Sequence, residues 1–173
     1  MNKIIIPQLV HFKRVTVPKY IDANIQKIAL KHLGLADMGK LRDRMEGQYY
    51  YNKLKIDLVS EFAFESFIGI KRFDWKKREP KSYPRKKYYF ENKTLKIITF
   101  YGNALPEINA TNIENSIFIY VNTDNKVLIS GIATTETLKE ILVKSNVNQV
   151  KITDFEHLAT FNTQEELEEK LTS

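Results

Sequence analysis

The chain has 173 residues, of which 43% are hydrophobic and 12% aromatic, so wholesale disorder is excluded and one domain with its own core is expected. It has no cysteine, which excludes disulfides, thiolate metal sites and cysteine nucleophiles and fits a reducing, cytoplasmic environment. The net charge of +6 is compatible with a polyanionic partner, and the short apolar runs predict neither a membrane span nor a signal peptide.

Hydrophobic spacing and glycine stops predict the helices of the first half. A helix is expected over residues 21–33 with Gly34 as its stop, and a shorter one over residues 36–45. The strongest helical pattern covers residues 51–68 and ends at Gly69.

The strongest predicted helix carries a row of acids. Asp57, Glu61 and Glu65 are spaced four residues apart and therefore lie along one face. Like charges in such a row repel, so they are expected either to be well solvated or to face cations. A solvated face is the favoured interpretation.

A long basic segment follows this helix. Between Lys71 and Lys87 nine bases stand against two acids, and prolines at 80 and 84 predict an irregular, exposed loop. Cations that neutralise phosphates alternate there with aromatic rings that can stack on bases, which favours binding of nucleic acid, with DNA as the expected partner. The residues expected to bind it are Lys71, Arg72, Trp75, Lys76, Lys77, Arg78, Lys81, Arg85, Lys86 and Lys87.

Strands dominate the second half of the sequence. The segment KYYFENKTLKIIT, residues 87–99, is interpreted as a turn followed by a strand. The elements predicted after it are strands over 93–101, 117–121, 126–130 and 150–153, a hairpin connection over 122–125, and helices from Thr134 or Thr135 to 144 and over 164–171. This order predicts an α/β (or α+β) fold with a mixed central β-sheet flanked by helices.

Three segments resemble the PD-(D/E)XK nuclease superfamily. Residues 52–70, NKLKIDLVSEFAFESFIGI, are similar to its glutamate-bearing helix, residues 93–100, KTLKIITF, to its catalytic strand, and residues 127–138, VLISGIATTETL, to a strand and helix of small phage-type members. The resemblance covers about half of the chain and implies a restriction-endonuclease-like fold. It also implies a division into an N-terminal helical extension (1–48), a nuclease-like core (49–153) and an acidic C-terminal segment (154–173), and a location in the host cytoplasm of a phage-infected cell.

The catalytic triplet of that family is degenerate in this sequence. Two acids of the family hold a divalent cation and a lysine assists the nucleophile. Aligned on the strand, Lys87 and Lys96 replace the acids and Ile98 replaces the lysine, whereas Glu61 matches the helix glutamate. Two cations would repel Mg²⁺, so these positions are interpreted as vestigial, no metal or cofactor is expected, and Lys87 or Lys96 is expected to pair with Glu61.

Three functions remain open from the sequence. The favoured one is an inactive nuclease-fold protein that binds nucleic acid through the basic aromatic loop. An active Mg²⁺-dependent DNA endonuclease with relocated carboxylates is the second, and it would use Asp57, Glu61, Glu65 and Glu91. The third is a phage-type protein-interaction module, such as an inhibitor or assembly factor, that binds a protein partner.

Overall fold

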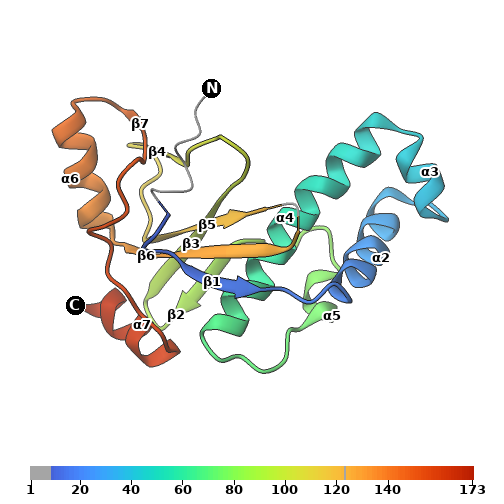
Figure 1. Cartoon of the computed structure of the whole chain (residues 1–173), viewed down its shortest axis with the longest axis horizontal. Coiled ribbons are helices and arrows are strands. Elements are labelled where there is room, and N and C mark those ends of the chain that lie inside the picture. The colour runs from blue at the N-terminus through green and yellow to red at the C-terminus, as the bar shows by residue number, and fades with distance from the viewer. Residues whose placement is uncertain (1–8, 123) are drawn as a thin grey trace.

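A five-stranded mixed β-sheet organises the molecule. The computed structural model describes residues 9–122 and 124–173, so residues 1–8 of the expected N-terminal extension and residue 123 of the expected hairpin connection lie outside the described residues. The strand order is β1-β6-β5-β3-β2, in which β3 and β5 are parallel and all other neighbours antiparallel. The predicted α/β architecture with a mixed central sheet flanked by helices is confirmed (Figure 1).

The elements follow in chain order. The strands are β1 (Lys13–Thr16), β2 (Lys87–Phe90), β3 (Lys93–Phe100), β4 (Glu107–Asn109), β5 (Ser116–Val121), β6 (Lys126–Ala133) and β7 (Gln149–Lys151). The helices are α2 (Ile21–Leu33), α3 (Met38–Arg42), α4 (Met45–Phe67), α5 (Trp75–Arg78), α6 (Thr135–Ser145) and α7 (Gln164–Thr172). Within the described residues, no helix has both the length and the apolar character needed to cross a bilayer.

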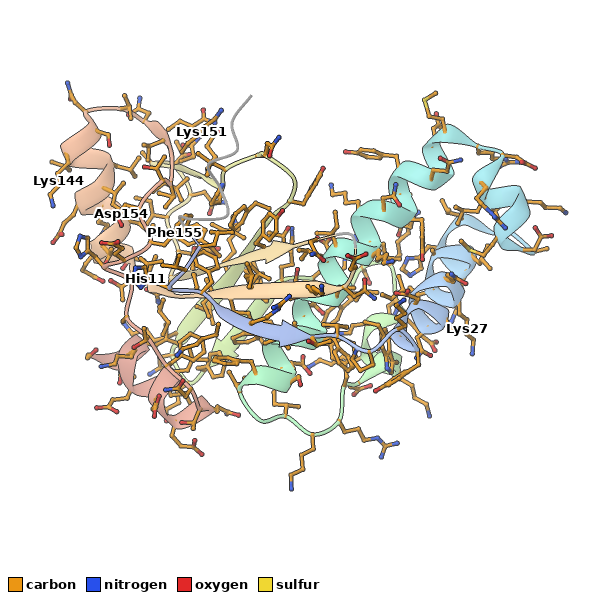
Figure 2. All side chains as sticks on the ribbon, in the orientation of Figure 1. His11, Lys27, Lys144, Lys151, Asp154 and Phe155 are labelled. Carbon is orange, nitrogen blue, oxygen red and sulfur yellow. The ribbon has the colours of Figure 1, made fainter. Side chains whose placement is uncertain are left out.

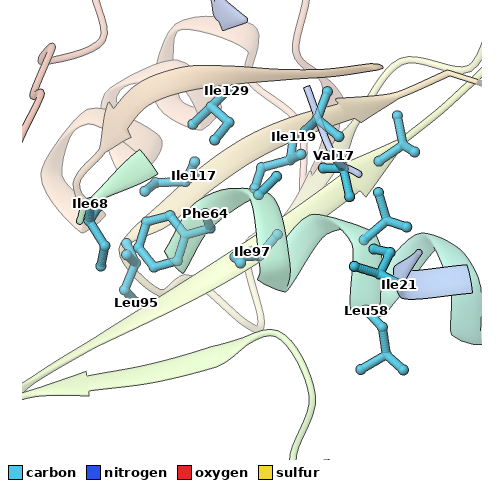
Figure 3. Packing of buried hydrophobic residues seen from close by; sticks show 14 of the residues in the cluster. Val17, Ile21, Leu58, Phe64, Ile68, Leu95, Ile97, Ile117, Ile119 and Ile129 are labelled. Carbon is cyan, nitrogen blue, oxygen red and sulfur yellow. The ribbon is translucent and has the colours of Figure 1, made fainter. Parts of the chain in front are cut away.

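The two faces of the sheet bury two separate apolar clusters. Side chains alternate along a strand, so Leu95 and Ile97 of β3 face α4, whereas Ile98 and Phe100 pack on the opposite face with α6. Figure 3 shows Phe64 of α4 among the β-branched side chains of the sheet, where its complete burial contributes about 1.5–3 kcal/mol. The long helix α4 is therefore fixed against one face of the sheet.

The outer segments of the chain belong to the same core. Strand β1 extends the sheet beside β6, and Ile21 and Ile25 of α2 are buried with the first cluster. Phe161, together with Leu167 of α7, reaches the same cluster from the C-terminal segment.

Two predictions of local structure were wrong. The helix expected over residues 36–45 is split, because α3 ends at Arg42 and α4 already begins at Met45. Gly47 lies inside α4, where a Cβ would come within 2.8 Å of the Leu41 carbonyl oxygen, so the glycine permits close packing rather than stopping a helix. The expected turn at residues 87–92 is a strand, β2, joined to β3 by a tight turn with Glu91 in the left-handed region (φ 49°).

Candidate functional site

The three carboxylates of α4 are buried. Asp57, Glu61 and Glu65 retain only 4%, 1% and 7% of their exposed surface, so the favoured prediction of a solvated face was wrong. The reason is that the segment between α4 and β2 folds back over this side of α4, and its cations approach the acids. The alternative of a row of acids that faces cations is confirmed.

Arg78 is the central cation of this cluster. Asp74 caps α5 by accepting a hydrogen bond from the Lys77 backbone N–H (3.0 Å), and this single turn directs Arg78 inward. The Arg78 Nε donates to Glu61 Oε2 at 2.6 Å, and one terminal nitrogen donates to Glu65 Oε1. Its guanidinium carbon also lies 3.7 Å from the centre of the Phe73 ring.

Further donors complete the cluster. The Lys86 backbone N–H donates to Glu61 Oε1 at 2.6 Å, and the Tyr88 hydroxyl donates to Glu65 Oε1 at 3.0 Å. Lys86 Nζ lies 3.2 Å from Asp57 Oδ1, and Arg85 Nε lies 3.6 Å from Asp57 Oδ2. Every carboxylate of the row thus faces at least one cation.

Burial and charge pairing shift the pKa values of the cluster. Burial raises the pKa of Glu61 above its ordinary value, although the hydrogen bonds from Arg78 and from the Lys86 backbone act in the opposite direction. Burial alone would lower the pKa of Arg78, but the hydrogen bond to Glu61 and the charges of Glu61 and Glu65 raise it, so the guanidinium stays charged. Burial, followed by these same two charges, raises the pKa of Tyr88, which donates as a neutral phenol.

The positions aligned with the nuclease triplet do not join Glu61. Lys96 and Ile98 alternate with Leu95 and Ile97, which face α4, so they point to the opposite face of the sheet. Lys87 lies directly across from Lys96, and its Nζ is 3.3 Å from Glu114 Oε1. The expectation that Lys87 or Lys96 pairs with Glu61 was therefore wrong, because Arg78 occupies that place.

The relocated carboxylates are only partly brought together. Asp57, Glu61 and Glu65 share one side of α4, whereas Glu91 is exposed in the β2–β3 turn, beside Glu168 and Glu169 of α7. In residues 9–122 and 124–173, no three His, Cys, Asp or Glu side chains are grouped so that they could hold a metal ion. With cations already at the acids, the arrangement does not fit Mg²⁺.

The basic segment divides into buried and exposed cations. Arg78 is buried, Arg85 and Lys86 are half-buried at Asp57, and Lys87 approaches Glu114. The members of the predicted binding set that are exposed and lie outside these pairs are Lys71, Arg72, Lys76, Lys77 and Lys81. This second group is exposed and outside these ion pairs, so the expected exposed loop holds for part of the segment.

A cavity of about 290 Å³ lies at the start of the basic segment. Its lining includes the cations Lys71 and Arg72 and the rings of Tyr20, Phe73 and Trp75. Trp75 is half-buried because it packs against Phe73 with ring centres 4.7 Å apart. The cavity thus combines two exposed cations with aromatic walls and, on the α4 side, with Glu65, whose carboxylate accepts a hydrogen bond from Arg78.

Two features of this region were not predicted from the sequence, namely the position of Tyr20 in the cavity lining and the burial of Arg78, which was expected among the exposed binding residues. Tyr20 enters the cavity from the end of the β1–α2 connection, far away in the sequence, and no local pattern indicates it. The burial of Arg78 had a local signal, because Asp74 is an N-cap residue and is followed at the right spacing by one helical turn.

Comparisons of the chain with protein-family models, with curated proteins and with solved structures found no significant match. The resemblance to PD-(D/E)XK nucleases therefore stays a prediction from the sequence.

Proposed function

We propose that the protein binds single-stranded DNA through the exposed cations and rings at the start of the basic segment. The observation that carries the proposal is the cavity of about 290 Å³ in which Lys71 and Arg72 meet the rings of Tyr20, Phe73 and Trp75. A phosphate pairs with a cation and a base stacks on a ring, so this combination suits an unpaired strand.

The exposed surface around the cavity extends this interaction. Lys76 and Lys77 are exposed on α5, directly after Trp75 of the cavity lining, whereas Lys81 lies farther away, 5.8 Å from the ring centre of Tyr50 in the first half of α4. Contacts to phosphates carry no sequence information, so binding is expected to be strongly salt-dependent and weakly selective for sequence.

The buried carboxylates favour binding over hydrolysis. Arg78 holds Glu61 and Glu65, and Lys86 approaches Asp57, so a divalent cation would have to displace these partners. The active Mg²⁺-dependent endonuclease would require this displacement. We therefore propose a protein that holds DNA without cutting it.

The test compares two charge-reversal variants with the wild-type protein. Lys71→Glu/Arg72→Glu removes both cations of the cavity, and Lys144→Glu/Lys151→Glu makes the same change in net charge at exposed positions at the α6 end of the molecule (Figure 2). Binding of a labelled oligonucleotide is measured over a range of salt concentrations. Quenching of Trp75, the single tryptophan, reports whether bases reach the cavity.

The wild-type protein and the Lys144/Lys151 variant should bind with the same steep salt dependence. The Lys71/Arg72 variant should bind more weakly, and the slope of log affinity against log salt should be smaller by about 1.4, for two lost phosphate contacts. Equal weakening in both variants, or binding without quenching of Trp75, would contradict the proposed surface.

A plasmid incubated with Mg²⁺ or with EDTA tests the endonuclease alternative in parallel. The proposal predicts no cleavage in either condition. Metal-dependent cleavage that disappears in Glu61→Ala would replace it with the active endonuclease, and neither binding nor cleavage would favour the protein-interaction module.

A further inference from the structure

A second cavity, of about 310 Å³, lies between the first half of α4 and the end of β3. Tyr49, Asn52 and Lys53 line it from α4, and Thr99 and Tyr101 line it from β3 and the residue that follows. It is separate from the cavity of the proposed function, which is lined by residues of the C-terminal half of α4, including Phe62 and Ser66.

The local structure explains why these side chains converge. Tyr49, Asn52, Lys53 and Ile56 are spaced as one face of a helix, so they point the same way from α4. Thr99 lies on the α4 side of the sheet, because it alternates with Ile98 and Phe100 on the opposite face.

Two tyrosines that line this cavity are largely exposed to solvent. Tyr49 is 70% exposed and Tyr101 is 57% exposed, although an aromatic side chain usually gains from burial. They come from different elements, Tyr49 from α4 and Tyr101 from the residue after β3, and both line the cavity, so each ring is available to a flat group that enters it.

Polar groups accompany the rings. The exposed Lys53 offers an ammonium group, and the exposed Asn52 offers an amide that donates and accepts. Asp57 and Lys86 also line the cavity, and the Asp57 carboxylate, which is 4% exposed, lies 3.2 Å from Lys86 Nζ. Rings, an ammonium group and an amide are the groups that recognise a base with its phosphate.

We infer that this second cavity holds one nucleotide of a single strand, with its base against the rings of Tyr49 and Tyr101 and its phosphate at Lys53. The inference rests on the proposed function for the class of ligand, DNA. It adds a distinct site whose position on α4 is separate from the Lys71 and Arg72 surface.

The first arm of the test locates the bound base. An oligothymidylate that contains 5-iodouracil is irradiated with the wild-type protein, and the crosslinked peptides are identified by mass spectrometry. Crosslinks to Tyr49 or Tyr101 are expected. Tyr89, which is 67% exposed on β2 and outside the cavity, is the internal control and should not react.

The second arm measures the contribution of the rings. Tyr49→Ala/Tyr101→Ala should weaken binding of the oligonucleotide about tenfold, as expected for the loss of one stacked base, while Tyr89→Ala should leave it unchanged. Both tyrosines are exposed, so unfolding of the variant is not expected, and thermal denaturation checks this.

The outcomes separate this inference from the proposed function. If the double tyrosine variant binds as tightly as the wild-type protein and still quenches Trp75, the second cavity is not a site but the proposed function stands. A third arm does not need strand binding: thymidine 5′-monophosphate is titrated while the tyrosine ring resonances are followed by NMR. Shifts at Tyr49 and Tyr101 support the site, and their absence together with absent crosslinks overturns it.

Discussion

Arg78 is the residue that pairs with the buried acids of α4. It is the buried cation that contacts both Glu61 and Glu65, and it comes from a segment whose composition suggests an exposed loop. Composition can identify nine bases in this segment, but it cannot identify the one that turns inward. That choice depends on the Asp74 cap, on Phe73 beneath the guanidinium and on the position of α4.

Replacement of Arg78 should destabilise the folded protein. Arg78→Met keeps much of the apolar stem but leaves two buried carboxylates without their cation, so the free energy of unfolding should fall by about 3–5 kcal/mol. Urea denaturation at neutral pH measures this loss. Lys77→Met, at an exposed position of the same helix, is the matched control and should change stability by less than about 0.5 kcal/mol. If Arg78→Met lowered the free energy of unfolding by no more than about 0.5 kcal/mol, as expected for Lys77→Met, the buried network would contribute little to stability.

The raised pKa of Glu61 predicts a specific pH dependence. The folded state holds this proton more tightly than the unfolded chain, so the resulting stability is present below the ordinary pKa of glutamic acid. It is lost as the pH rises through the raised pKa of Glu61. Glu61→Gln cannot titrate, so the stability of the wild-type protein relative to this variant should decrease as the pH rises across that interval.

Denaturation curves of both proteins at a series of pH values measure this difference. Glu140→Gln, at an exposed position of α6, controls for the loss of one acidic group. A difference between wild type and Glu61→Gln that grows with increasing pH would show that the pKa of Glu61 is lowered instead.

At the scale of elements, strand β6 depends on a close approach by the C-terminal segment. The Ile132 N–H donates to the Ala159 carbonyl at 2.8 Å, and the Ala159 N–H donates back at 3.2 Å. A Cβ on Gly131 would lie 2.7 Å from the Ala159 carbonyl oxygen and 2.8 Å from that of Leu158. Both atoms belong to the backbone, so the segment itself would have to move.

Gly131→Ala should therefore destabilise the protein by about 1–3 kcal/mol, the usual cost of overpacking. In Gly131→Ala, hydrogen exchange at the Ile132 and Ala159 amides should be faster than in the wild-type protein, whereas exchange at the amides of β3 should be unchanged. Thr160→Ala, a change at an exposed position of the same segment, is the control and should leave both amides protected. Unchanged protection in Gly131→Ala would mean that the segment adapts without loss of its hydrogen bonds.

The bounds of three helices were predicted well, whereas α4, which has the strongest apolar pattern, begins six residues before its expected start at residue 51. Helix α2 has the expected bounds, and α6 and α7 are within one or two residues of theirs. Strand β1 was missed because Lys13–Thr16 is short and mostly polar, as a strand at the edge of a sheet permits. Strand β2 was taken for a turn because its four residues precede the Glu91 turn directly.

At the scale of the whole molecule, the mixed α/β class followed from the order of elements, but the pairing of strands did not. Strand β3 pairs in parallel with β5 across a connection that contains β4, and no local pattern indicates this partner. The two cavities also depend on pairing and docking, since Tyr20 and Tyr101 join them from elements remote from α4. The kinds of side chain on this surface could therefore be proposed from the sequence, but their arrangement in space could not.

The pairing of β1 with β6 has a consequence for how the chain is made. Lys13 pairs with Ile129, 116 residues later in the sequence, so β1 cannot pair until β6 has been synthesised. Contacts this distant in sequence slow folding, and until they form the edge of β6 is open. The same four residues of a second copy have the same pairing groups, so we expect exchange of β1 between copies at high protein concentration.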